Sequence, residues 1–160
     1  MFVFRKLSLH DIALIYEDME LKPLLTVKPM GQKFGVVMDI DGCLKGGITG
    51  YIDREGAMIQ KLKIKKEYAT PLCKDGLIRS LIHALDLNGI KLLFTKKTED
   101  IDIYTNIGFK KIDSIILDSN IILGDIIKKD IGRDHIFFIN LKDFFNKNSC
   151  NRGPKVNNMR

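Results

Sequence analysis

The sequence is poor in cysteine and histidine, and neither residue type is spaced like a metal site. The three cysteines, Cys43, Cys73 and Cys150, are odd in number and form no CxxC pair. This spacing is unlike that of a zinc site or of a disulfide framework. The three histidines are equally scattered, and none has a second ligand at helical or hairpin spacing. We therefore expect no bound metal.

Long apolar runs are also missing. No window approaches about eighteen consecutive apolar residues, which a membrane-spanning helix would need. The opening stretch MFVFRKLSLHD has too short an apolar run for a signal peptide, and an acid follows soon after. These features predict a cytoplasmic protein with no membrane partner, and 160 residues fit one domain.

Acidic residues are absent from the C-terminal stretch 146–160, which supplies four of the six net positive charges. The stretch is polar and contains Gly153 and Pro154, so we expect a basic, disordered tail after a domain that spans 1–145. A nucleic-acid surface would instead gather cations and aromatic residues on one folded face, so we expect no nucleic-acid partner. The clearest cationic cluster of the body fits a solvated strand edge as well as an anion-attracting mouth, and consists of Lys61, Lys63, Lys65 and Lys66.

The first half of the chain predicts a strand, a helix and an antiparallel meander. A strand at 2–6 precedes a helix that Ser8 and Asp11 begin with a capping box, and its apolar residues recur at helical spacing: Leu9, Ile12, Ile15, Tyr16 and Met19. Two prolines then bracket a loop or a broken second helix. Turn signals at 41–42 and 53–56 separate three strands, at 33–38, 44–52 and 57–68.

The second half alternates helices and strands. Apolar spacing over 77–85 marks a helix that Asn88 and Gly89 end, and 90–94 reads as a buried strand. Thr98 is the expected cap of a helix that Gly108 ends, and strands follow at Phe109 and at 135–141. The order β-α-α-β-β-β-α-β-α-β-β predicts a mixed α/β (α+β) sheet with one parallel pair.

Two strings within this order resemble the GCN5-related N-acetyltransferase (GNAT) superfamily. They are FRKLSLHDIALIY at 4–16 and DIDIYTNIGFKKI at 100–112. The second is similar to the family segment A-x-x-L-Y-x-x-x-G-F, with Tyr104, Gly108 and Phe109 on the matched positions. The resemblance reaches about residue 141 and implies the acyl-CoA N-acyltransferase fold.

A narrower likeness is to the N-terminal acetyltransferase-like domain of citrate lyase ligase. It is carried by GGITG at 46–50, DGLIRSLIHAL at 75–85 and LLFTKKTEDIDIYTNIGF at 92–109. That enzyme continues into a nucleotidyltransferase domain, whereas this chain ends, so we do not expect ligase activity.

The resemblance implies acetyl-CoA bound where the fourth and fifth strands separate, with its pyrophosphate on the amides at the start of the next helix. The family motif there is Arg/Gln-x-x-Gly-x-Gly/Ala. The register that buries Leu81 and Ile82 puts Cys73 at its first position, Gly76 at the middle glycine and Ile78 where Gly or Ala is expected. Ile78 would crowd the pyrophosphate. The remaining cofactor contacts would be backbone amides, and Lys74 would add positive charge. These amides belong to Lys74, Asp75, Gly76, Leu77 and Ile78.

The resemblance also implies that the preceding strand binds the pantetheine arm. An ungapped count places this contact at Lys66, Glu67 and Tyr68, although the apolar pattern ends earlier, at Leu62 and Ile64. Either the strand runs on to Tyr68, which is our expectation, or the loop is longer.

The remaining roles that the resemblance implies fall on single side chains. Tyr104 would donate a proton to the leaving thiolate, although a tyrosine on an amphipathic helix also simply packs. Lys97 would face a CoA phosphate. No general base stands out, and Asp53, Glu55 and Glu67 are candidates by location alone.

The predicted function is acetyl-CoA-dependent N-acetyl transfer to a small-molecule or protein amine, by direct attack in a ternary complex. The alternative is a catalytically inactive domain of the same fold that binds a ligand or a partner. An exposed edge strand at 135–141 would allow a homodimer.

Overall fold

A computed structural model describes residues 1–25, 31–112, 121–132 and 135–146. Its centre is a seven-stranded sheet in the order β1-β2-β3-β4-β5-β7-β6. The strands are β1 Phe2–Lys6, β2 Gln32–Ile40, β3 Cys43–Asp53, β4 Gly56–Ile64, β5 Leu92–Lys96, β6 Lys110–Lys111 and β7 Ile136–Asn140. The helices are α1 Leu9–Glu17, α2 Pro71–Leu87, α3 Ile101–Ile107 and α4 Asp125–Ile131, with 3₁₀ turns η1 Lys22–Leu25 and η2 Lys66–Tyr68. Residues 141–146 after β7 are also helical.

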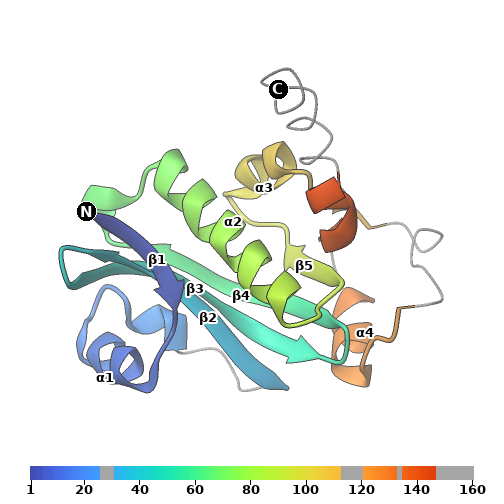
Figure 1. The fold of residues 1–160 in the computed structure, drawn as a ribbon, viewed down its shortest axis with the longest axis horizontal. Coiled ribbons are helices and arrows are strands. Elements are labelled where there is room, and N and C mark those ends of the chain that lie inside the picture. Colours follow the sequence, from blue (N-terminus) through green and yellow to red (C-terminus); the bar gives the residue numbers. More distant parts are fainter. Residues whose placement is uncertain (26–30, 113–120, 133–134, 147–160) are drawn as a thin grey trace, which may run out of the picture.

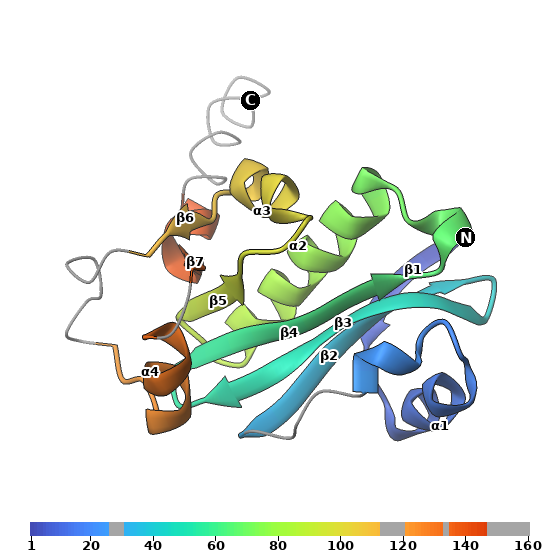
Figure 2. The same ribbon diagram turned by 180° about the vertical axis from the view of Figure 1, so that it is seen from behind.

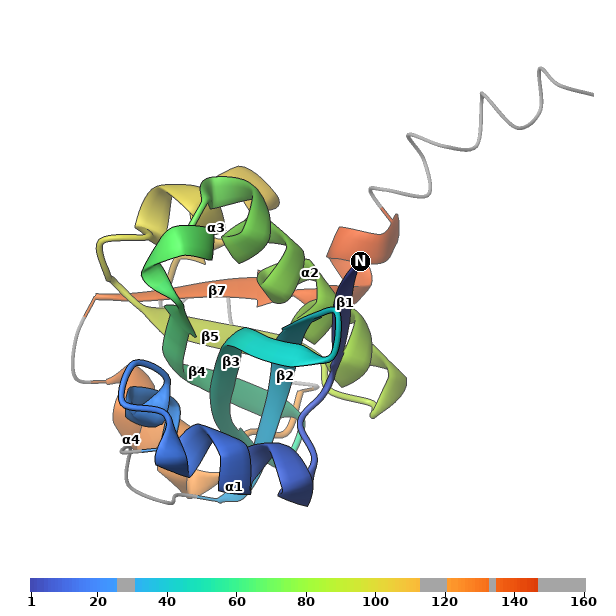
Figure 3. The same ribbon diagram turned by 90° about the vertical axis from the view of Figure 1, so that its left-hand side faces the viewer.

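The helices cover both faces of the sheet. Helices α2 and α3 lie in front of it in Figure 1, whereas α1 and α4 lie in front of it when it is seen from behind in Figure 2. The side view shows the resulting three layers (Figure 3). Strands β1 to β4 are antiparallel neighbours, β4 and β5 are parallel, and β7 is antiparallel to β5. The predicted mixed sheet, with its meander and single parallel crossover, is confirmed.

Local sequence explains several element boundaries. Asp41 and Gly42 turn between β2 and β3 with φ of 52° and 86°, the left-handed values that a tight hairpin requires. The capping box at the start of α1 is confirmed, because the Ser8 hydroxyl accepts from the Asp11 N–H and the Asp11 carboxylate accepts from the Ser8 N–H. Gly89, with φ of 79°, follows the end of α2 as expected.

The core consists of three apolar clusters, one under each group of helices. The largest lies between the sheet and α2 and α3, and its members include Met38, Ile48, Leu77, Leu81 and Tyr104. The second packs α4 on β3, β4, β5 and β7, and the third packs α1 and η1 on β2. Burial of this kind contributes roughly 25 cal/mol for each Å² of apolar surface.

The face that α1 buries differs from the expected one. Of the apolar residues spaced along this helix, only Ile15 is buried, together with the carboxylate of Asp11. The others are exposed, namely Leu9, Ile12, Tyr16 and, just beyond the helix, Met19. The Asp11 side chain is buried because Arg5 donates to both of its oxygens, at 2.6 and 2.9 Å.

Some predicted boundaries are wrong. Strand β4 ends at Ile64, and the residues to Tyr68 form the 3₁₀ turn η2 instead of continuing the strand. The expected second helix is only the four-residue turn η1. Helix α3 begins after Asp100 rather than after Thr98, whose hydroxyl accepts from the Asp100 N–H outside the helix.

The expected edge strand at 135–141 is also wrong, since β7 lies between β5 and β6. The exposed edge on which we based a homodimer is therefore not there. Helix α4 was not predicted at all. The basic tail, predicted for 146–160, lies outside the described residues except for Asn146. Over the described part of the chain, no helix has the length and apolar character needed to cross a membrane.

Candidate functional site

Strands β4 and β5 separate in the middle of the sheet. They pair over only four residues each, from Gly56 with Leu92 to Ile59 with Thr95. At the next residue β4 has a bulge, because Ile59 pairs with Gly50 and Lys61 with Thr49, which leaves Gln60 without an opposite residue. Strand β4 then continues to Ile64, and no described strand pairs with its β5-facing edge. This leaves a strip of backbone donors and acceptors over 60–64.

Tyr104 lies at the point where the strands separate. Its side chain is buried and packs edge-to-face on Phe109, with ring centroids 5.1 Å apart. Its side chain lies near that of Thr95, the last β5 residue that pairs with β4. Burial raises the pKa of Tyr104, and the nearby Asp100 raises it further, against a lowering by Thr95. The hydroxyl therefore stays protonated at neutral pH.

The N-terminus of α2 is largely occupied by its own cap. Thr70 is the N-cap, and its side chain accepts from the Cys73 N–H at 3.2 Å. Pro71 has no N–H, and the Lys74 N–H donates to the Thr70 carbonyl at 3.1 Å. Of the first turn only the Leu72 amide lacks a described partner. The Thr-Pro signal for this helix start was present in the sequence and was missed.

The five residues assigned to the phosphate loop, Lys74 to Ile78, lie inside α2. The expectation that their amides are free is wrong, because helical hydrogen bonds use them. Leu77 and Ile78 are fully buried in the main core, so Ile78 faces the sheet and does not crowd a ligand. A Cβ on Gly76 would lie 2.5 Å from the Phe4 ring, so this glycine allows β1 and α2 to pack closely.

The charged and thiol side chains of α2 are also engaged. Lys74 pairs with Asp100 at 2.7 Å, which ties α2 to the start of α3. Asp75 pairs with Arg79 one turn along, at 2.8 Å. Cys73 is buried in the main core.

The turn η2 holds the three residues expected on the pantetheine-binding strand. The Lys66 N–H donates to a Glu20 carboxylate oxygen at 2.5 Å, and the Tyr68 ring lies 5.2 Å from the Lys45 ammonium. Glu67 is exposed. The strand backbone that faces the separation is thus the edge of β4 at 60–64. This agrees with the second option given above, a longer loop between the end of the strand and α2. Lys97 is exposed and directly follows β5, where its N–H donates to the His135 carbonyl.

Two of the three candidate bases have structural partners instead. Asp53 accepts from the Ile126 and Ile127 amides at the start of α4, at 2.9 and 3.2 Å. Glu55 pairs with Lys91 at 2.7 Å, which lowers the pKa of Glu55. Both flank the β3–β4 turn, at the end of β4 away from Ile64. Among the described residues there is no group of three or more His, Cys, Asp or Glu side chains placed to hold a metal ion.

No family model matches the sequence, and no curated protein does. Solved structures do match the architecture. N-acetylglutamate synthase from Neisseria gonorrhoeae, complexed with coenzyme A and N-acetyl-glutamate, superposes with a TM-score of 0.60 and 17% identity over 88% of this chain. The fold is that of the GNAT acyl-CoA N-acyltransferases. This chain spans only 35% of the length of that synthase.

Two further GNAT-fold structures match over nearly their whole length. The ribosomal-protein-S18-alanine N-acetyltransferase from Escherichia coli has a TM-score of 0.59 and 12% identity, and 86% of this chain covers 91% of it. The PaiA N-acetyltransferase from Thermoplasma acidophilum, in complex with coenzyme A, has a TM-score of 0.58 and 17% identity, with 88% and 99% covered. At these identities the likeness establishes the fold, and activity is argued below from the site.

Proposed function

We propose that this protein is an N-acetyltransferase that uses acetyl-CoA as donor and an amine, on a small molecule or a protein, as acceptor. The observation that carries the proposal is the separation of β4 from β5 at Gln60, with a protonated Tyr104 at the same point. The free edge of β4 over 60–64 fits the pantetheine arm of CoA, which carries amide donors and acceptors of its own. Coenzyme A bound to other GNAT-fold proteins supports the same donor.

In this proposal the chain positions two reactants and moves one proton. The β4 edge binds the arm and orients the thioester, and bringing both reactants into one ternary complex lowers the entropic barrier to direct attack by the amine. The nitrogen–acyl bond forms as the carbon–sulfur bond breaks, and Tyr104 donates its proton to the departing sulfur. The proton that the attacking nitrogen loses passes to solvent water, from which Tyr104 is reprotonated. Lys97, exposed just after β5, is the proposed partner of a CoA phosphate.

The proposal is tested by titrating the protein with acetyl-CoA and with CoA in a calorimeter, and by thermal denaturation in the same buffers. We expect binding by both ligands and a rise in Tm. Release of free thiol is then followed with a panel of amino acids, polyamines and peptide N-termini. No heat and no Tm shift with about millimolar ligand, a concentration at which even weak sites fill, would exclude the enzyme.

The Tyr104→Phe variant separates a chemical role from a structural one. Phe keeps the contact with Phe109 and removes only the hydroxyl, so we expect kcat to fall by about 10²-fold while the affinity for CoA changes little. Tyr16→Phe is the matched control, because the Tyr16 side chain is exposed on α1. Equal losses of kcat and of affinity in Tyr104→Phe would show that this tyrosine only packs.

A second candidate is a GNAT-fold domain that binds a ligand or a partner without catalysis. The observation that favours it is the start of α2, where Thr70 and Pro71 leave one free amide in the first turn. CoA binding without thiol release for any amine would favour this candidate. The narrower likeness to the N-terminal domain of citrate lyase ligase also stays a prediction. It is tested by measuring whether that domain acetylates the same amine that the panel identifies for this protein.

A further inference from the structure

We propose that the open edge at the start of β2 is a docking site for an extended, acidic peptide segment of a partner protein. The site is defined by residues 32–35 of β2 and the groove around them. Its centre lies two strands away from the separation of β4 and β5, although the groove extends to Gln60, the residue at which these strands separate. The proposal does not depend on acyl transfer.

The first observation is an unpaired strand edge. Strand β1 follows β2 only as far as the pair of Lys6 with Val36, after which the Leu7 N–H donates to the Gly35 carbonyl at 2.9 Å. Before Gly35, no described strand lies on that side of β2. Outward-facing backbone groups alternate along a strand, so Lys33 shares the direction of Gly35 and presents its N–H and C=O to solvent. An added strand would take up these groups.

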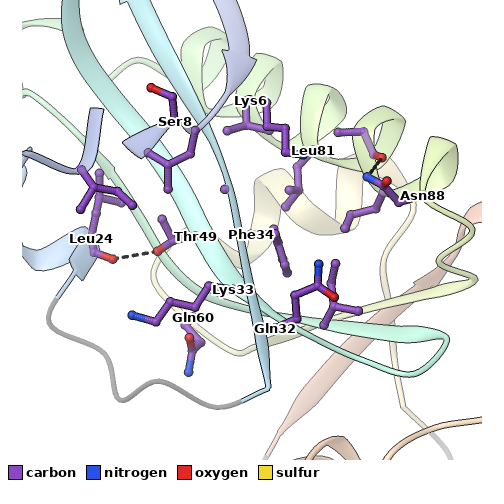
Figure 4. Close-up of a pocket in the computed structure, with 18 of the residues that line it drawn as sticks. Lys6, Ser8, Leu24, Gln32, Lys33, Phe34, Thr49, Gln60, Leu81 and Asn88 are labelled. Atoms are coloured by element: carbon purple, nitrogen blue, oxygen red, sulfur yellow. Dashed lines mark hydrogen bonds between the residues drawn. The ribbon is translucent and has the colours of Figure 1, made fainter. Parts of the chain in front are cut away.

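The second observation is a groove of about 670 Å³ that wraps around this edge. Figure 4 shows Phe34 and Leu81 on the α2 side and Leu24 and Thr49 on the α1 side of β2. Side chains of an added strand point alternately to the two faces of the sheet. A docked segment would therefore place successive side chains in the two halves of the groove.

The third observation is an exposed apolar stripe on α1, which among the described residues is contacted by the Lys22 ammonium, 4.8 Å from the centre of the Tyr16 ring. Leu9, Ile12 and Tyr16 line the groove at helical spacing and are 86%, 37% and 63% exposed. The third core cluster reaches this helix through Ile15, on its other side. Contiguous exposed apolar surface beside an open strand edge is typical of an interaction site.

Charge identifies the kind of partner. The groove is lined by three cations, Lys6, Lys33 and Arg54, and by no aspartate or glutamate. None of the three has a described carboxylate within salt-bridge distance, whereas Arg5, next to Lys6, has two. An acidic segment would supply the missing partners. Edge-to-edge pairing of two copies would instead bring Lys33 toward its own counterpart, and like charges directly opposite each other are unfavourable.

The test uses a short, end-capped peptide that alternates valine with glutamate, labelled with a fluorophore, and the full-length protein. Binding is followed by fluorescence anisotropy, with a valine–lysine peptide of the same length as comparison. We expect the acidic peptide to bind and the basic one not to. The double variant Lys6→Glu/Lys33→Glu should weaken binding by at least about tenfold, because it reverses two of the three cations. Lys128→Glu/Lys129→Glu on α4 makes the same charge change away from the groove and should leave binding unchanged.

A second pair of variants tests the backbone contact. Lys33→Pro removes the outward N–H and the charge, while Lys33→Thr removes the charge alone. Since the lost N–H faces solvent, both should keep the circular dichroism spectrum, and Pro should weaken peptide binding several-fold more than Thr. Equal effects would overturn strand pairing, and so would equal binding of acidic and basic peptides.

Three other results would also overturn the proposal. One is the absence of peptide binding at about millimolar concentration, where even the weakest specific contacts register. Another is a concentration-dependent dimer in sedimentation that Lys33→Glu alters, which would make a second copy the occupant. The last is binding of decanoate in the groove that neither peptide displaces, which would make the groove a site for a small amphiphile.

Discussion

At the scale of single residues, the most consequential charge is buried Asp11. It is 1% exposed and accepts from Arg5 twice, from the Ser8 hydroxyl at 2.9 Å and from the Ser8 N–H at 2.9 Å. Arg5 also reaches Asp39 on β2 at 3.2 Å. One carboxylate therefore joins β1, the start of α1 and, through Arg5, β2. These contacts hold the pKa of Asp11 at about 2, below its ordinary 3.8, because they favour the ionised form, with Arg5 the largest cause.

This depressed pKa predicts a loss of stability in acid. A group whose pKa is lower in the folded state stabilises the fold above its unfolded pKa, and the stabilisation disappears as pH falls through the folded pKa. Between pH 3.8 and about 2 the free energy of unfolding should fall by about 2 kcal/mol from this residue. Urea unfolding of the wild type and of Asp11→Asn across this range measures it, because the variant lacks this contribution.

The Asp11→Asn substitution should itself cost about 3 kcal/mol at neutral pH, since it leaves Arg5 without its main partner. The gap between wild type and variant should close as pH falls. Asp41→Asn is the control: its carboxylate pairs with the exposed N-terminus, and removing such a surface pair costs less than about 1 kcal/mol. A gap that stays constant with pH would show that Asp11 does not titrate as described.

At the scale of elements, the fit of α2 on β1 depends on Gly76. A Cβ at this position would lie 2.5 and 2.8 Å from two atoms of the Phe4 ring. Gly76→Ala should therefore destabilise by about 1–2 kcal/mol, although alanine is the better helix former by about 1 kcal/mol. In a Phe4→Ala background the overlap is gone, so the same substitution should become stabilising. A double-mutant cycle by urea unfolding measures the sign change, and CoA affinity should stay unchanged because Gly76 faces Phe4.

Helix α4 depends on a cap from another element. Asp53 at the end of β3 accepts from the Ile126 and Ile127 amides, and a Cβ on Gly124 would overlap the Asp53 carboxylate. Asp53→Ala should cost about 1–2 kcal/mol, as the loss of an N-cap does. Gly124→Ala should destabilise the wild type but add little to Asp53→Ala. Additive costs in this second cycle would show that the two residues do not meet.

The two helices show why some elements could be predicted from the sequence and others could not. Helix α2 has its own Thr-Pro start, apolar spacing and terminal glycine, so its existence followed from local residues. Helix α4 is short, and its cap comes from a residue 73 positions earlier in the chain, which no local pattern reveals. The end of β4 was likewise missed, because an ungapped count of the family spacing extends the strand to Tyr68, although the apolar pattern ends at Ile64. Glu20, from a distant loop, binds the Lys66 amide.

The same limit applies to the candidate site. The Tyr104 segment was recognisable because its residues are consecutive, but the approach of Tyr104 to Thr95 depends on how α3 packs on β5. The phosphate-loop assignment relied on Gly76 and on the register that buries Leu81 and Ile82. Residue 76 is glycine because it packs against Phe4 on β1, more than 70 residues earlier. The exposed stripe on α1 has the spacing of a buried face, and only the position of the sheet shows that it is uncovered.

At the scale of the whole molecule, the sheet is two parts joined by a short seam. Strands β1 to β4 form one antiparallel part and β5 to β7 the other, and only four residue pairs of β4 and β5 connect them within the sheet. Helix α2 spans the seam, since its buried residues lie in the same cluster as residues from both parts. The proposed acyl-CoA site begins where the seam ends. The proposed peptide site is centred on the other side of β3, at β2, and its groove reaches Gln60 at the end of the seam.

Hydrogen exchange can therefore separate the two proposals in one molecule. Acetyl-CoA should slow exchange of the β4 amides over 60–64 that face the separation, because it would occupy their only free side. The valine–glutamate peptide should slow exchange of Lys33 and Gly35 at the open edge of β2. With ligand at about 100 times Kd, amides that open by local fluctuation should slow by up to about a hundredfold. Gln60 lines the groove as well as the separation, so the two footprints should meet there at most. Residues 61–64 and the edge of β2 should stay distinct, since β3 pairs with both strands. Protection of 61–64 by the peptide would mean that the groove leads into the acyl-transfer site and holds its acceptor. Protection at neither place by either ligand would contradict both proposals.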